Sequence, residues 1–252
     1  MDDFPRIDSH QHFTREYLPS LLFPILKRNR FDGTVVVAKV PSIEESRWLL
    51  GLAAEHPFIR GVVCWADLSD PRPGALLDEY QRHPKFRGVV FAGPALPAAD
   101  LSPEALAELV RRDLTLDLPP SLDLAAGIAQ KFSALRVAID HIGRPSLMEA
   151  APAAQLAELA SYPNVVVKIS GLITDAPTQW SAGQFAPWVH AALAAFGAER
   201  VMYGSDWPSY LPVGTWKESL AAFTQALGAQ TMETREHLLG ATARRFYRLE
   251  AA

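Results

Sequence analysis

Histidines and carboxylates stand at the ends of several apolar segments of this sequence. His10 and His12 lie two apart in RIDSHQHF, His141 follows Asp140 in VAIDHIG, and Asp206 lies in MYGSDWP. Side chains alternate along a strand, so His10 and His12 point to the same side if their segment is extended. Imidazoles with a carboxylate can bind a divalent cation and leave a position open for water. They can also work without metal: the carboxylate takes a proton from water and the imidazoles donate to a carbonyl oxygen.

These residues are far apart in the sequence, so the fold has to bring them together. Several β-rich runs are near-continuous Val/Ile/Leu stretches, which are typical of buried parallel strands. The eight runs are RIDSHQH, GTVVVAKV, IRGVVCWADL, FRGVVFAG, LTLDLP, LRVAIDHIG, NVVVKISG and RVMYGSDWP. Segments with helical spacing lie between them, and Ser42 and Ser102 are expected N-caps of two of these helices. The alternation predicts a (β/α)8 barrel, one domain over residues 1–252, with extra helices after the eighth strand.

In such a barrel the carboxyl ends of the strands form the catalytic face, and the eighth strand neighbours the first. We therefore expect Asp206 beside the two N-terminal histidines, with His141 facing them from the sixth strand. Lys168 ends the seventh run, where it would either stabilise a developing negative charge or extend outward to solvent. Asp140 would either orient an imidazole or be a solvated turn residue. Aromatic residues at strand ends, Trp65 and Trp207 among them, would either wall a pocket or simply pack.

Composition narrows the class of protein. The chain has 252 residues, of which 49% are hydrophobic and 21% charged, with a net charge of −4. This balance gives no basic surface for nucleic acid or for an anionic membrane. No apolar run approaches the ~18 residues of a membrane span, and the N-terminal segment lacks the apolar region of a signal peptide. Cys64 is the one cysteine, expected to be buried and inert. We expect a cytoplasmic protein that acts on a small molecule; its oligomeric state stays open.

The motifs IDSHQHF, VAIDHIGRP, VVVKISGLITDA and VMYGSDWP resemble, in order and spacing, those of the amidohydrolase superfamily. Within it the chain is similar to the amidohydrolase-2 group and its sugar-lactonase branch, which includes fuconolactonase-like, rhamnonolactonase-like and 2-pyrone-4,6-dicarboxylate lactonase enzymes. The resemblance covers nearly the whole chain. It implies a (β/α)8 barrel that hydrolyses a lactone ring.

The resemblance also implies roles for individual residues. Asp206 would be the general base that activates water, and His10, His12 and His141 would polarise the lactone carbonyl. No metal is strictly required on this interpretation. If one divalent ion such as Zn²⁺ is bound, His10, His12 and Asp206 would ligate it. Asp117 lies where the branch often has an aspartate, which would hold sugar hydroxyls or only cap the strand.

The sequence departs from the family pattern in three places. A metal-binding Lys or Glu on strand four and a His on strand five are replaced by VVFAG and LTLDLP. The Arg-His pair that usually follows the strand-four glycine is replaced by Val89, Val90 and Phe91 after Gly88. The loops after strands one and four are shorter than is usual for the branch, which predicts a more open pocket or a different ring.

Three functions follow as hypotheses. The first is hydrolysis of a sugar or related lactone with Asp206 as base. The second is a metal-dependent decarboxylase or amide hydrolase of the same group. The third is a barrel that binds a small molecule without turnover, because the strand-four cation is missing. Substitution of Asp206 and sensitivity to chelators separate them.

Overall fold

Eight parallel strands form one sheet in sequence order, which confirms the predicted barrel. The computed structural model describes residues 4–91, 101–143, 151, 153–174, 176 and 179–250. The strands are β1 (Ile7–Gln11), β2 (Gly33–Val37), β3 (Ile59–Trp65), β4 (Phe86–Val90), β5 (Thr115–Leu118), β6 (Arg136–Ile139), β7 (Val165–Ile169) and β8 (Val201–Tyr203). Neighbouring strands pair in parallel from β1 to β8.

The sheet closes where the chain leaving β8 meets β1. Gln11 forms a parallel bridge with Trp207. The amide of Asp206 donates to the carbonyl of His10 at 2.8 Å, and the amide of His12 donates to the carbonyl of Trp207 at 2.7 Å. These bonds lie within the two segments that carry the predicted base and histidines, so closure of the barrel sets the spacing between them.

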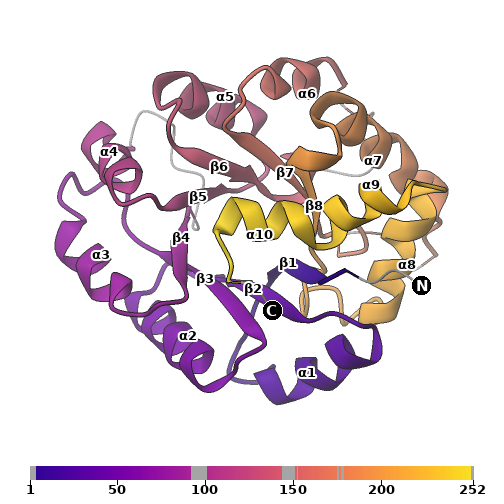
Figure 1. Cartoon of the computed structure of the whole chain (residues 1–252), viewed down its shortest axis with the longest axis horizontal. Helices are drawn as coiled ribbons and strands as arrows, with labels where there is room; N and C mark the ends of the chain where they lie inside the picture. The colour runs from indigo at the N-terminus through magenta and orange to yellow at the C-terminus, as the bar shows by residue number, and fades with distance from the viewer. Residues whose placement is uncertain are drawn as a thin grey trace.

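Helices surround the strands (Figure 1). They are α1 (Pro19–Arg28), α2 (Ile43–Glu55), α3 (Gly74–Gln81), α4 (Pro103–Arg111), α5 (Leu122–Lys131), α6 (Ala153–Ala160), α7 (Ala182–Phe196) and α8 (Trp216–Leu227). As expected, the hydroxyls of Ser42 and Ser102 cap α2 and α4 by accepting from amides of the first turn. No helix of the described residues is long and apolar enough to cross a membrane.

The strands are buried on both faces because helices cover the outside and side chains fill the inside. All five residues of β2 and all five of β7 are buried. Cys64 in β3 is buried too, and burial raises the pKa of its thiol well above the usual value, as expected of an inert cysteine. Residues 92–100, which hold the loop after strand four, lie outside the described part of the chain.

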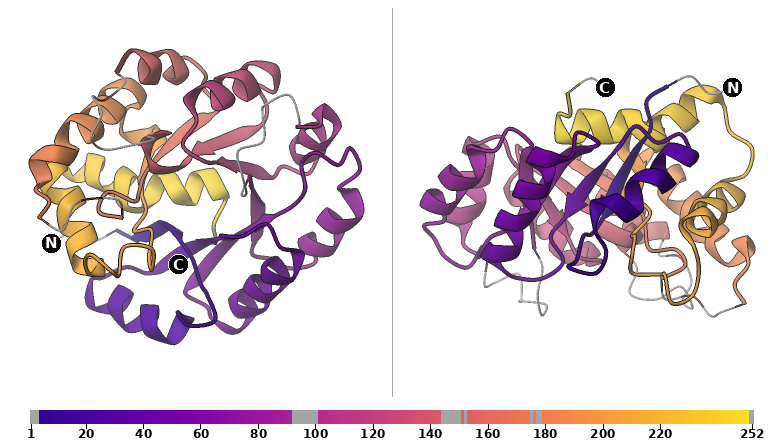
Figure 2. Two further views of the ribbon diagram at one scale, coloured as in Figure 1. Left: turned by 180° about the vertical axis from the view of Figure 1, so that it is seen from behind. Right: turned by 90° about the horizontal axis from the view of Figure 1, so that it is seen from below.

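Extra C-terminal helices follow α8, as predicted: α9 (Met232–Glu236), a π-helical turn (His237–Ala241) and α10 (Thr242–Tyr247). Figure 2 shows α10 lying across one end of the barrel. That end is the amino-terminal one, because Arg136, the first residue of β6, donates to the carbonyl of Phe246. The predicted catalytic residues are at the opposite, carboxyl ends of the strands.

Candidate active site

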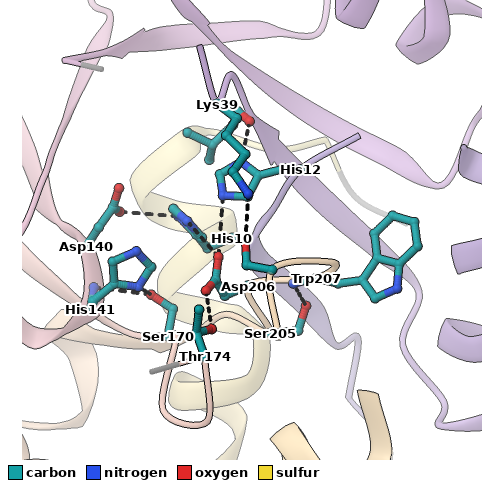
Figure 3. Close-up of polar contacts among 12 residues, drawn as sticks. His10, His12, Lys39, Asp140, His141, Ser170, Thr174, Ser205, Asp206 and Trp207 are labelled. Atoms are coloured by element: carbon teal, nitrogen blue, oxygen red, sulfur yellow. Dashed lines mark hydrogen bonds and ion pairs between the residues drawn. The ribbon is translucent and has the colours of Figure 1, made fainter. Parts of the chain in front are cut away.

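Four predicted side chains converge at the carboxyl ends of the strands (Figure 3). His10 lies in β1 and His12 just after it, while Asp206 follows β8. His141 belongs to a short 3-10 turn, Asp140–Gly143, that follows β6. The His10 ring centroid is 4.9 Å from that of His12 and 5.0 Å from that of His141. Oδ1 of Asp206 lies 3.9 Å from Nε2 of His10 and 3.4 Å from Nε2 of His12.

The backbone at two of these residues is in the left-handed region. His141 has φ 54° and Asp206 has φ 63°. Residues other than glycine rarely adopt such values, and where they do the surrounding structure has to hold them. Gly171 also has a positive φ, and a β-carbon there would lie 2.8 Å from Nδ1 of His141 and 3.3 Å from Oδ2 of Asp206. The chain after β7 therefore passes directly against both side chains.

Asp206 is held as a carboxylate. Thr174 donates its hydroxyl to Oδ2 at 2.5 Å, which leaves Oδ1 facing the two histidines. Burial raises the pKa of Asp206, but the hydrogen bond with His12 and the charges of His141, His12 and His10 outweigh burial and hold it well below the usual value. At neutral pH this group can accept a proton.

His12 and His141 are each fixed through Nδ1. In His12 this nitrogen lies 2.7 Å from the carbonyl oxygen of Val37, which can only accept, so Nδ1 of His12 carries a proton. In His141 it lies 2.9 Å from Oγ of Ser170, which also accepts from the His141 amide at 3.2 Å.

A buried cluster of charged residues contacts Nδ1 of His10. Nζ of Lys168 lies 3.1 Å from Nδ1 of His10, 2.5 Å from Oδ2 of Asp117 and 2.9 Å from Oδ1 of Asp140. Tyr247 donates to the same Oδ2 of Asp117 at 2.7 Å. Lys168 is fully buried and does not extend outward to solvent. Asp140 is also buried, 3.3 Å from Nδ1 of His10, and is not a solvated turn residue.

The charges of this cluster follow from its contacts. Burial lowers the pKa of Lys168, but Asp117 and Asp140 outweigh burial and raise it above the usual value. Burial lowers the pKa of His10 to about 3, against the raising effect of Asp140, so this imidazole is neutral at pH 7. An ammonium group thus faces a neutral ring.

The predicted substrate-binding residues occupy different places. Lys168 and Asp117 are fully buried beneath His10, in contact with each other. Trp207 is buried between Phe13 and Tyr17, with ring centroids at 5.9 Å and 5.7 Å. Trp65 ends β3 and is half-buried. A role of any of these four in holding substrate stays a prediction.

A cavity of about 470 Å³ opens beside the site. Its walls come from the segments after β1, β2 and β8, and include Tyr17, Lys39 and Ser209. Exposed Lys39 donates to Oγ of Ser209 at 3.1 Å, and the amide of Ser209 donates to the carbonyl of Asp206 at 2.9 Å. The cavity therefore adjoins the loop that carries the predicted base.

Sequence reasoning missed two residues of this network. Thr174 lies in the quoted stretch ISGLITDA, but it belongs to a loop where no periodicity fixes direction. Tyr247 is on α10 at the far end of the barrel, with a helical pattern typical of a packing residue. Thr174 could have been found as a hydroxyl residue three positions after the glycine that follows the seventh strand. Nothing in the sequence pointed to Tyr247 as a residue of the site.

The donor set fits a divalent cation. One atom each from His10, His12 and Asp206 lies within 4.8 Å of the others, and Nε2 of His10 has no hydrogen-bond partner among the described residues. Two imidazole nitrogens and a carboxylate oxygen suit zinc with an open position for water. A cation there would polarise a carbonyl or lower the pKa of a bound water.

Comparison with known proteins agrees with this architecture. Residues 7–249 match the family described as Amidohydrolase. An L-fucono-1,5-lactonase of Burkholderia ambifaria is 33% identical over 232 residues, 81% of this chain and 80% of that protein. An L-fucono-1,5-lactonase of Burkholderia multivorans is 31% identical over 97% of this chain and 96% of its own. A crystal structure of an amidohydrolase from Burkholderia multivorans with bound zinc superposes with a TM-score of 0.86 at 29% identity, covering 98% of this chain and all of the other.

Proposed function

The chain belongs to the amidohydrolase family, and from this premise we propose that it hydrolyses a lactone, with a sugar lactone as the first substrate class to test. The observation that carries the proposal is the position of Asp206, whose Oδ1 faces Nε2 of His10 and of His12 at the carboxyl ends of the strands. Two L-fucono-1,5-lactonases similar to the chain support the choice of substrate.

Asp206 is the general base of the proposed reaction. Its carboxylate takes a proton from water, and the water oxygen bonds to the carbonyl carbon of the lactone. The oxyanion that forms needs donors already in place, each worth about 3 kcal/mol. His10, His12 and His141 surround Asp206 and are the proposed source of these donors. When the tetrahedral species collapses, the bond to the ring oxygen breaks and this oxygen receives the proton from Asp206, which gives a hydroxy acid.

Asp206→Asn tests the base. The amide keeps the shape and the hydrogen bond from Thr174 can persist, but it cannot take a proton, so kcat is expected to fall by about 10²- to 10⁴-fold. A pH indicator follows ring opening on a panel of aldonolactones that includes L-fuconolactone. Asp123→Asn, at an exposed position in the first turn of α5, is the matched control and should retain full activity. Equal ring opening by both variants, or none by the parent protein on any lactone, contradicts the proposal and favours a binding protein.

A metal-dependent version of the hydrolase is the second candidate. It is favoured by the donor set of His10, His12 and Asp206 and by the zinc bound in the similar Burkholderia multivorans structure. The same assay separates the two after dialysis against a chelator. Activity that is lost and then restored by Zn²⁺ supports the metal-dependent reaction, whereas unchanged activity in chelator supports the metal-free one.

A further inference from the structure

The contacts of His10 and His12 differ in a way that sets where each ring carries its proton. A neutral imidazole has one N–H and one lone pair, and the partner of one nitrogen decides the state of the other. Nδ1 of His12 faces the carbonyl of Val37, an acceptor. Nδ1 of His10 faces the ammonium group of Lys168, a donor. Nδ1 of His12 is therefore a donor, whereas Nδ1 of His10 is an acceptor.

Lys168 is held so that it can only donate. Asp117 Oδ2 lies 2.5 Å from Nζ, and this oxygen is also bound by the hydroxyl of Tyr247 at 2.7 Å. With a second carboxylate, that of Asp140, at 2.9 Å, Lys168 is in ammonium form and has no lone pair to offer. An N–H that did not reach His10 would be left without an acceptor in a fully buried interior, which destabilises that arrangement.

Asp140 is the competing partner of Nδ1, and the geometry disfavours it. Its Oδ1 lies 3.3 Å from Nδ1 of His10 and is already paired with Nζ of Lys168 at 2.9 Å. The contact between Lys168 and Nδ1 is shorter and has hydrogen-bond geometry. Nε2 of His10 is buried, without a hydrogen-bond partner among the described residues, and it faces Asp206.

We propose that Lys168, held by Asp117 and Tyr247, donates to Nδ1 of His10 and so places the imidazole proton on Nε2, where it donates to the carbonyl oxygen of the lactone. His10 then presents an N–H to the site at Nε2. Lys168, Asp117 and Tyr247 are positioning residues that act through His10. The proposal concerns the protein without metal, because a cation on Nε2 would replace this proton. Its chemical role, though not the tautomer itself, rests on the proposed function.

The tautomer can be measured without any substrate. Protein labelled with ¹⁵N in its histidines and kept in chelator is examined by long-range ¹H–¹⁵N correlation, and His10→Gln and His12→Gln identify the two rings. Nε2 of His10 is expected in the proton-bearing range and Nδ1 of His10 in the lone-pair range, whereas Nδ1 of His12 is expected in the proton-bearing range. The Nδ1–H form in His10 overturns the proposal. Absence of lactonase activity with the expected tautomer contradicts only the proposed function.

Tyr247→Phe tests the supporting contact on Asp117. Loss of this hydroxyl loosens Asp117 and Lys168, so kcat on a lactone is expected to fall about 3- to 10-fold with KM unchanged, and part of the His10 signal should shift toward the Nδ1–H form. Tyr80→Phe is the matched control, since Tyr80 is also buried and donates to the backbone carbonyl of Trp65 at 3.2 Å, without contacting Asp117, Lys168 or His10. Equal kcat and identical His10 signals in both variants overturn the role of Tyr247.

Discussion

At the scale of single residues, the site depends on what lies behind each reactive group. The three histidines are alike in the sequence, yet their Nδ1 atoms face a lysine, a backbone carbonyl and a serine hydroxyl. These second contacts fix the ring orientation and the free nitrogen of each. The chemical difference between His10 and His12 therefore comes from Lys168 and Val37 and not from the histidines themselves.

Gly171→Ala should lower kcat by at least 10-fold, because the new β-carbon would lie 2.8 Å from Nδ1 of His141 and displace it from Ser170. The positive φ also lowers the free energy of unfolding of the alanine variant by about 1–2 kcal/mol. Gly197→Ala separates the two effects, since Gly197 also has a positive φ (68°) but no atom within 4 Å of the place that a methyl group would take. Thermal unfolding and lactone kinetics of both variants are compared. Full activity in Gly171→Ala would contradict the close packing described at His141.

At the scale of elements, the junction of β8 with β1 determines the distance between Asp206, the proposed base, and the two histidines of β1. The two segments exchange backbone hydrogen bonds on either side of Asp206. Gly204 permits this approach: a β-carbon there would lie 2.5 Å from Cβ and 3.0 Å from the amide nitrogen of His10. Asp8 supports the junction, because its Oδ1 accepts from the amide of Ser205 at 2.8 Å.

Gly204→Ala is therefore expected to push β8 away from β1, with a loss of about 1–3 kcal/mol in stability and of most activity. Gly51→Ala is the control. Gly51 lies inside α2 with nothing within 4 Å, so alanine should stabilise the protein by about 0.5–1 kcal/mol without altering kcat. Denaturant unfolding and the lactone assay measure both. Unchanged stability in Gly204→Ala would show that the junction has room that the structure does not indicate.

The positions of the elements were accessible from the sequence because buried parallel strands appear as Val/Ile/Leu runs, and helices between them carry Ser caps. The convergence of His10, His12, His141 and Asp206 followed from strand order alone. The alternatives for Lys168 and Asp140 could not be decided, since a polar residue at a strand end has the same pattern whether it points into the barrel or outward. Tyr247 was out of reach because its contact with Asp117 crosses the barrel interior from a helix at the other end.

At the scale of the whole molecule, the barrel interior is a connected polar path inside an apolar wall. A chain of hydrogen bonds runs from the amino-terminal end toward the site, through Tyr247, Asp117, Lys168 and His10. Removing one member leaves its partners buried without compensation. Cys64 in β3 is fully buried within this wall.

The reactivity of the Cys64 thiol shows how far solvent reaches into β3. Because its pKa in the folded chain is raised by burial, its contribution to stability is complete below the unfolded thiol pKa, about 8.5, and is lost as pH rises through the folded value. At pH 9 the native protein is expected to resist alkylation by iodoacetamide, while the protein in denaturant reacts at the rate of a small thiol. Quantitative modification in native buffer at that rate would show that β3 opens locally.

The contact between Tyr247 and Asp117 also has a consequence for synthesis on the ribosome. All eight strands precede Tyr247 in the chain. A nascent polypeptide whose eight strands have already emerged from the ribosome therefore still lacks the hydroxyl that binds Asp117. The proposed hydrolytic activity is then expected to arise only after α10 has left the exit tunnel and docked, rather than when the eighth strand joins the first.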